Sequence, residues 1–145
     1  MKKVYIAGPI SPTKIGGEGV LEYLENINKG IALTTQALLA GYAPFSPFVD
    51  FLYFVHTRTP CTPENVEKIR GSSMEWLRVS DAILVLRPYK HSYGTRAEVR
   101  EALRLGIPIF FSVPLMDLYF HFLGQGACEA EGIIDSANTL EGTDG

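Results

Sequence analysis

The sequence predicts an α/β fold, a Rossmann-like or flavodoxin-like three-layer sandwich with a parallel sheet of four to five strands. Two observations favour it. Short apolar runs at residues 4–7, 82–86 and 107–113 are continuous rather than alternating, as in strands buried on both faces. Segments with helical periodicity separate these runs, and glycine or proline ends most of them. Ligands bind such sheets at the carboxyl ends of the strands.

The first part of the chain predicts a strand, a loop, a helix and a second strand. Residues 4–7 run into Gly8 and a proline, which mark a turn. Across residues 20–38, apolar side chains recur every three, four or seven positions, and Gly41 follows as a helix stop. We expect residues 43–45 to form the second, short strand.

The middle of the chain predicts one helix, preceded by aromatic-rich residues 48–55 that show no clear pattern. A threonine, a proline and a glutamate at residues 62–64 are typical of a helix start. This helix is expected to run towards Ser80. If Gly71 interrupts it, a capping box of Ser72 and Glu75 restarts it.

The last part predicts two strands and two helices. Residues 82–86 form a buried strand, residues 87–94 a polar loop, and residues 95–105 a helix that a glycine closes. Residues 107–113 form the last strand, and an apolar helix follows at about residues 115–123.

The 145 residues are expected to form one domain over residues 1–123, followed by an acidic Gly/Ala-rich tail, residues 124–145, with a disordered end. Residues 1–123 carry too little positive charge for a nucleic-acid-binding surface. No apolar run is long enough for a signal peptide or a membrane span. Cys61 and Cys128 match neither a metal nor a disulfide pattern. We therefore expect a cytoplasmic protein that binds neither nucleic acid nor a membrane.

Glu98 is an acid at the inward edge of an amphipathic helix. It shares a stripe with Ala102 and Leu105, in what is predicted to be the first turn, beside the strand ends. The helix dipole favours an ionised carboxylate there. A purely structural interpretation also fits, in which Glu98 stabilises its helix and pairs with a neighbouring arginine. Periodicity alone leaves both open.

Two loops offer further binding groups. The glycine-rich residues 8–19 lack both common phosphate-binding glycine motifs, so a plain flexible loop is the simpler interpretation. Ser92 and Gly94 precede the helix of Glu98, where a hydroxyl and backbone amides can receive a phosphate, or where Ser92 simply caps the helix. Trp76 is expected in the core.

Three segments carry a resemblance to a known family: "VYIAGPIS" at the first strand, "MEWLRVSDAILVL" at the third, and "SYGTRAEVREALRLGIPIF" after it. Together they resemble the nucleoside 2-deoxyribosyltransferase-like family, which includes deoxynucleoside monophosphate N-glycosidases. The resemblance implies cleavage or transfer of an N-glycosidic bond through a covalent sugar ester on Glu98, with Tyr5 in contact with this nucleophile. It implies no metal and no organic cofactor, and a homodimer or higher homo-oligomer.

The same resemblance bears on the substrate. Ser92 indicates a nucleoside monophosphate, since the transferases that act on nucleosides have an aspartate there, which would repel a phosphate. Gly8, Pro9 and Gly94 are expected to line the substrate site. Ser11 stands where the monophosphate enzymes have an arginine.

Ser73 departs from the family, which has at this position an aspartate that helps to protonate and position the base. Asp50, in a loop expected at the same end of the sheet, is the best substitute, and Glu75 is a poorer one. Asp81 precedes its strand and is expected to be structural. The alternative function is a non-catalytic nucleotide-binding or sensor module of the same fold, and a structural subunit with an empty pocket is a third hypothesis.

Overall fold

Four short strands form one parallel sheet in the order β2-β1-β3-β4. The structure is a computed structural model, and it describes residues 1–123. This all-parallel sheet with flanking helices confirms the predicted fold class, and its order is the one with which a flavodoxin-like sheet begins. The strands are β1 (Lys3–Ala7), β2 (Ala43–Phe45), β3 (Ala82–Val85) and β4 (Ile109–Phe110).

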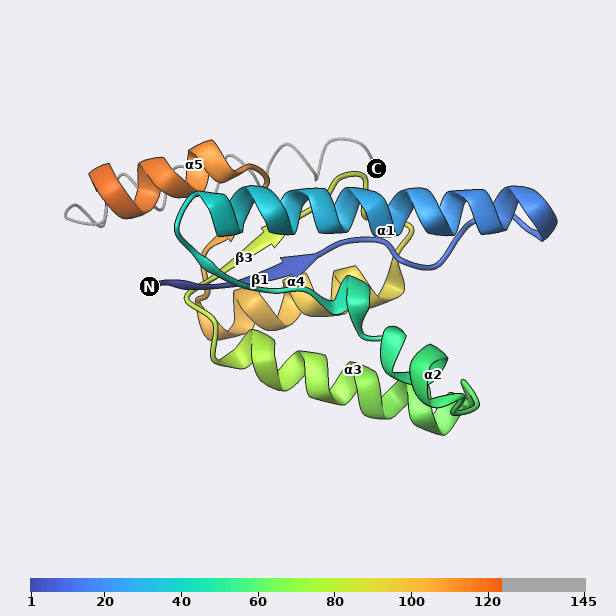
Figure 1. The fold of residues 1–145 in the computed structure, drawn as a ribbon. Helices are drawn as coiled ribbons and strands as arrows, with labels where there is room; N and C mark the ends of the chain where they lie inside the picture. Colours follow the sequence, from blue (N-terminus) through green and yellow to red (C-terminus); the bar gives the residue numbers. More distant parts are fainter. Residues whose placement is uncertain (124–145) are drawn as a thin grey trace.

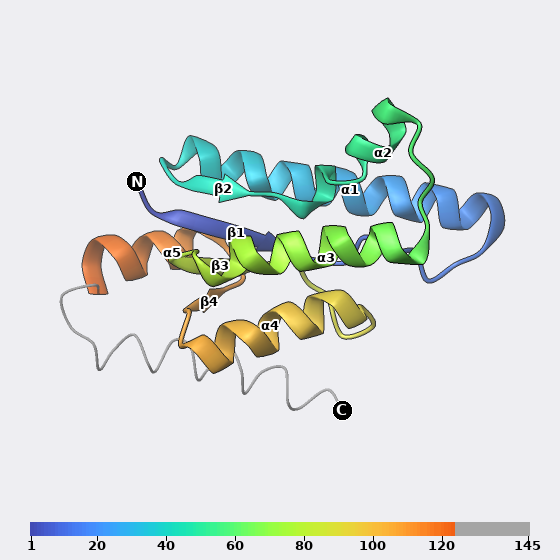
Figure 2. The same ribbon diagram turned by 90° about the horizontal axis from the view of Figure 1, so that it is seen from below.

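Helices cover both faces of the sheet (Figures 1 and 2). On one face lie α1 (Gly16–Leu39), α5 (Val113–Leu118) and the π-helical turn η2 (Tyr119–Leu123). On the other lie α3 (Pro63–Arg78) and α4 (Tyr93–Leu105). The short helices η1 (Pro47–Val49) and α2 (Leu52–Thr57) follow β2.

The core is split by the sheet into two clusters, because successive side chains of a strand point to opposite faces. Val4 and Ile6 pack towards α1 and α5, whereas Tyr5 and Ala7 pack towards α3 and α4. All four side chains are fully buried. This alternation directs the Tyr5 hydroxyl to the face that α4 covers.

The structure decides between the two predicted courses of α3. Thr62 caps the helix as expected, since its Oγ1 accepts a hydrogen bond from the Asn65 backbone N–H at 3.2 Å. The helix is continuous to Arg78, so its predicted course towards Ser80 is confirmed and the alternative of an interruption at Gly71 with a capping-box restart is wrong. One interior glycine costs a helix only about 1 kcal/mol. Packing of α3 against the sheet, with Leu77 fully buried, outweighs that cost.

Trp76 does not lie in the core. It is 50% exposed, and its ring stacks on that of Phe45 at the edge strand β2, with centroids 5.3 Å apart. The buried positions of α3 are taken instead by the smaller Ser73 and by Leu77. The prediction failed because aromatic character alone does not determine which helix face a residue occupies.

Several boundaries also differ from the predicted ones. Helix α1 begins at Gly16 rather than residue 20, and α4 begins at Tyr93 rather than residue 95, because the Ser92 side chain caps it. The last strand is only Ile109–Phe110, since Ser112 caps a new helix and ends the extended run. The helix expected at about residues 115–123 is therefore divided into α5 and η2.

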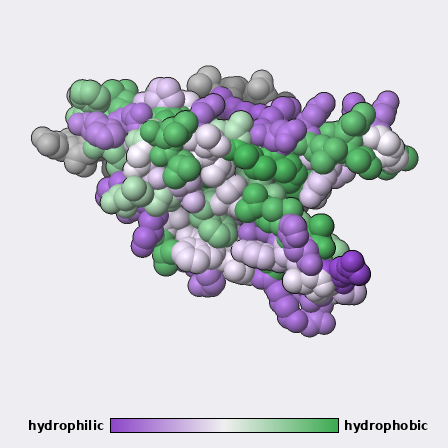
Figure 3. All heavy atoms as spheres, in the orientation of Figure 1, coloured by the Kyte–Doolittle hydropathy of each residue, from purple (hydrophilic) through white to green (hydrophobic). Residues whose placement is uncertain are grey.

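Apolar side chains are exposed along α1, and Figure 3 shows hydrophobic surface over this helix. The periodic residues that predict the helix are mostly on its solvent side, and small residues make its close contacts. Gly30 lies so close to Phe48 that a Cβ there would come within 2.3 Å of the ring. The exposed apolar residues of α1 are Val20, Leu21, Leu24, Ile31, Leu38 and Leu39.

The division into one domain and a tail, and the homo-oligomer, stay predictions. The tail lies outside the described residues. No helix within residues 1–123 is both long and apolar enough to cross a membrane.

Candidate active site

Three loops meet at the carboxyl edge of the sheet, as expected. They are residues 8–15 after β1, η1 with α2 after β2, and residues 86–92 after β3 (Figure 1). Asp81 lies at the opposite edge, where its Oδ2 accepts a hydrogen bond from the Lys3 backbone N–H at 2.7 Å. Its expected position at the far end of the sheet is therefore confirmed.

Tyr5 and Glu98 form a hydrogen-bonded pair at this edge. The Tyr5 hydroxyl donates to Glu98 Oε1 at 2.6 Å. The two residues are far apart in the chain, and they meet because Tyr5 points to the sheet face against which α4 packs. Among the described residues the partner of Glu98 is this tyrosine, and the arginine pairing included in the structural interpretation is not found.

The Glu98 carboxyl is protonated more readily than an ordinary glutamate. Burial raises its pKa to about 7, the charge of Asp50 acts in the same direction, and the hydrogen bond from Tyr5 opposes them. Glu98 lies in the second turn of α4 rather than the first, because the helix begins at Tyr93. Desolvation therefore outweighs the expected effect of the helix dipole, which fades beyond the first turn.

Asp50 and Ser73 form a second pair beside the first. Ser73 Oγ donates to Asp50 Oδ2 at 2.8 Å, and the two residues are only 6% and 4% exposed. Burial raises the Asp50 pKa, and the Ser73 hydrogen bond opposes this. Burial also raises the Tyr5 pKa, as do Glu98 and Asp50. Ser73, which stands where the resembled family has an aspartate, is thus hydrogen-bonded to Asp50, the acid expected to take the role of that aspartate.

A small pocket of about 130 Å³ opens onto these residues. Glu98 and Ser73 contribute to its wall, whereas Tyr5 and Asp50 stand behind them. The remaining wall is largely apolar, which suits a flat ring system, and its polar side chains are Ser11, Arg70 and Ser92. The pocket is lined by Gly8, Ile10, Ser11, Pro47, Phe51, Ile69, Arg70, Ser73, Met74, Ser92, Gly94 and Glu98.

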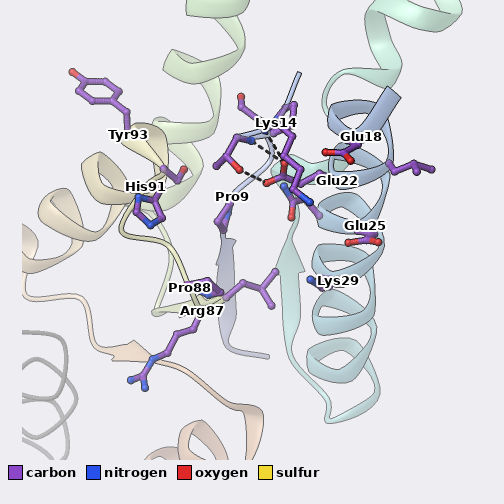
Figure 4. A pocket seen from close by; sticks show the side chains of 17 residues that line it. Pro9, Lys14, Glu18, Glu22, Glu25, Lys29, Arg87, Pro88, His91 and Tyr93 are labelled. Carbon is purple, nitrogen blue, oxygen red and sulfur yellow. Dashed lines mark hydrogen bonds between the residues drawn. The ribbon is translucent and has the colours of Figure 1, made fainter. Parts of the chain in front are cut away.

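A larger, open pocket of about 720 Å³ adjoins the small one and shares Ser11 and Ser92 with it (Figure 4). Pro9 and residues 11–14 form one wall, and one side of α1 from Glu18 to Lys29 forms another. Glu22 fixes this loop, since its carboxylate accepts hydrogen bonds from the Thr13 backbone N–H, the Thr13 hydroxyl and the Lys14 backbone N–H. The loop is therefore anchored, unlike the plain flexible loop that its glycines suggested.

The other expected binding residues lie around these two pockets. Pro9 lines the larger one, and Gly8 and Gly94 line the smaller. Ser92 is the N-cap of α4, because its Oγ accepts a hydrogen bond from the Thr95 backbone N–H at 3.2 Å. A Cβ on Gly94 would meet nothing within 4 Å, but one on Gly8 would collide with Leu86 at 2.8 Å. Gly8 is thus required for packing as well as for the pocket.

Sequence reasoning missed Arg70, which lines the small pocket. The spacing between Arg70 and Ser73 could have indicated that Arg70 faces the same pocket. Arg70 precedes Ser73 by three positions, and residues three apart on a helix share a face. Within residues 1–123, no group of three or more His, Cys, Asp or Glu side chains is placed to hold a metal ion.

Similarity to known proteins is found among solved structures. No protein-family model and no curated protein matches this chain. A solved structure of a 2-deoxyribosyltransferase from the psychrotolerant bacterium Bacillus psychrosaccharolyticus, described as a biocatalyst for nucleoside synthesis, is similar with a TM-score of 0.47 and 19% sequence identity. The similarity covers 74% of this chain and 69% of the other.

Proposed function

We propose that this protein cleaves or transfers the N-glycosidic bond of a (deoxy)nucleoside monophosphate or nucleoside through a covalent glycosyl–Glu98 intermediate. The observation that carries the proposal is the Tyr5–Glu98 pair, a largely buried carboxyl held by a 2.6 Å hydrogen bond at the wall of a small, mostly apolar pocket. A carboxylate with this orientation and a pKa of about 7 is ionised in a large fraction of molecules at neutral pH.

In the first step, Glu98 attacks the anomeric carbon of the sugar. Tyr5 holds Oε1, so Oε2 forms the new C1′–O bond while the C1′–N bond breaks and its electron pair goes to the base. In the second step, the oxygen of water, or a ring nitrogen of an acceptor base in a transfer, attacks C1′ and restores the Glu98 carboxylate. Net retention of configuration follows from these two displacements.

The departing base takes its proton from Asp50 through Ser73. In the structure Ser73 Oγ donates to Asp50; when Asp50 takes up a proton this bond reverses, so that the Asp50 carboxyl donates to Ser73 Oγ and the hydroxyl proton of Ser73 passes to a base nitrogen beside the broken bond. The bonded pair, 2.8 Å apart, makes this relay possible, and burial favours the protonated acid. Water then returns one proton to Asp50 by the same route in the second step, so the protons balance.

A 5′-phosphate fits the start of α4. Ser11, Ser92 and Gly94 line the small pocket there, and the first-turn amides of a helix attract an anion. The open space above Gly94 leaves room for this group. The substrate sugar would then lie between the phosphate seat and Glu98, with the base against the apolar wall.

The direct test is base release from a panel of deoxynucleosides, deoxynucleoside monophosphates and their ribose counterparts, followed by chromatography. We expect the wild-type protein to release free base, most rapidly from monophosphates. Calorimetry on the same panel separates the alternative, since tight binding without any base release would establish a binding or sensor module. Neither binding nor release would contradict both.

Replacing Ser73 by alanine is expected to slow base release by about 10²- to 10⁴-fold, the usual contribution of a general acid. The change removes the relay but keeps the Tyr5–Glu98 pair, so substrate affinity measured by calorimetry should change little. Ser72→Ala is the matched control, because Ser72 is an exposed neighbour on α3 that lines neither pocket. Wild-type rates in the Ser73→Ala variant would rule out the relay.

A further inference from the structure

Arg70 is the one cationic side chain among the described residues that line the small pocket. It lies in α3 at the rim, with 57% of its side chain exposed. Its guanidinium Nη1 donates to Glu67 Oε1 at 2.7 Å, an exposed pair one turn apart on the same helix. Exposed pairs of this kind contribute little to stability, so Arg70 can exchange Glu67 for a ligand at small cost.

The position of Arg70 relative to Ser73 indicates which part of a ligand it meets. Residues three apart on a helix are neighbours, with Cβ atoms about 5–6 Å apart. In the proposed reaction, Ser73 faces the base nitrogen beside the broken bond. Arg70, nearer the pocket rim on the same face, then lies along the edge of the base that points away from the sugar. The apolar side chains Ile10, Pro47, Phe51, Ile69 and Met74 line the space between.

We infer that Arg70 donates hydrogen bonds to this outer edge of the base. It thereby selects bases that carry an oxo group there over bases that carry an amino group. The inference rests on the proposed function. Arginine has five N–H donors and no acceptor, so it bonds to an oxo oxygen but leaves an amino group without a partner. Hypoxanthine, guanine, uracil and thymine carry the oxo group, and adenine and cytosine carry the amino group.

The same contact assists departure of the base. When the C1′–N bond breaks, the electron pair that goes to the base is delocalised onto the oxo oxygen. A guanidinium bonded to that oxygen stabilises the developing negative charge, before the proton from Ser73 neutralises the base. An amino group accepts no such bond, so Arg70 favours oxo bases in turnover as well as in binding.

Two matched pairs of substrates, all of them 5′-monophosphates, test this inference. The first pair is 2′-deoxyinosine 5′-monophosphate and 2′-deoxyadenosine 5′-monophosphate, and the second is 2′-deoxyuridine 5′-monophosphate and 2′-deoxycytidine 5′-monophosphate. We expect wild-type kcat/KM to favour the oxo member of each pair, and Arg70→Ala to lower each oxo-to-amino ratio by about tenfold to a hundredfold. Comparing ratios between proteins cancels the different intrinsic lability of the bonds. Arg70→Lys, which keeps the charge but loses the planar fork, should give intermediate ratios.

The control is Lys68→Ala, because Lys68 is an exposed cation on the same helix, paired with Glu64 and absent from the pocket lining. Its ratios should equal those of the wild type. If Arg70→Ala releases base with unchanged ratios, or slows both members of a pair equally, the role of Arg70 is refuted and the proposed function stands. If the wild-type protein releases no base from any substrate, the proposed function fails and this inference falls with it.

Discussion

Glu98→Gln is expected to reduce base release at least about a thousandfold, since the amide cannot form the sugar ester. The substitution is nearly isosteric, and the amide oxygen can still accept the Tyr5 hydrogen bond that the carboxylate accepts at 2.6 Å. The pocket and its affinity for nucleotide should therefore persist. Chromatographic assay of free base, with calorimetry on the same preparation, measures both quantities.

The matched control for this prediction is Glu101→Gln, one turn further along α4. Glu101 bonds to Arg78 and Arg104 outside both pockets, and these partners hold its pKa at about 2. Its loss should leave base release unchanged. Equal rates in the wild type and Glu98→Gln would show that Glu98 is not the nucleophile, whatever the fate of the other proposals.

Glu98→Gln is also expected to change how stability depends on pH. The folded protein holds the Glu98 proton up to a pKa of about 7, against a reference value of 4.5 for the unfolded chain. Below pH 4.5 the Glu98 carboxyl is protonated in both the folded and the unfolded state, so it does not lower the free energy of unfolding. Between pH 4.5 and 7 the unfolded state ionises first, so the folded state loses stability as pH rises, by about 3 kcal/mol in all.

Urea unfolding at pH 4.5, 6 and 8 measures this effect. The free energy of unfolding of the wild type should fall relative to that of Glu98→Gln across this range, so that the variant is the more stable protein at pH 8. Tyr5 and Asp50 are the titratable groups that face Glu98. Both remain in the variant, so the difference between the two proteins isolates Glu98. Parallel stability curves would show that the carboxyl is not desolvated in the folded protein.

The elements of this fold were largely predictable from local pattern. Continuous apolar runs at β1 and β3 can only be satisfied by burial on both faces, and they imply a parallel sheet with helices on each side. The start of α3 followed from Thr62 and the proline after it, because capping and a fixed φ act within one turn. Local pattern left the course at Gly71 open, where packing against the sheet overrides the preference of a single residue.

The sequence by itself determined the order along the chain of the four strands and of the longer helices, but not the short helices η1 and α2. Together with the resemblance, it singled out Tyr5, Glu98, Ser73 and Asp50 as candidates. The resemblance implied the contact of Tyr5 with Glu98, but only the tertiary structure shows their hydrogen bond and the pairing of Ser73 with Asp50. Tyr5 reaches Glu98 because of the face to which β1 directs it, and Ser73 reaches Asp50 because α3 packs beside the loop after β2. Glu98 acquires its raised pKa from desolvation by residues distant in the chain. Burial and long-range hydrogen bonds depend on the packing of whole elements, which spacing along the sequence does not specify.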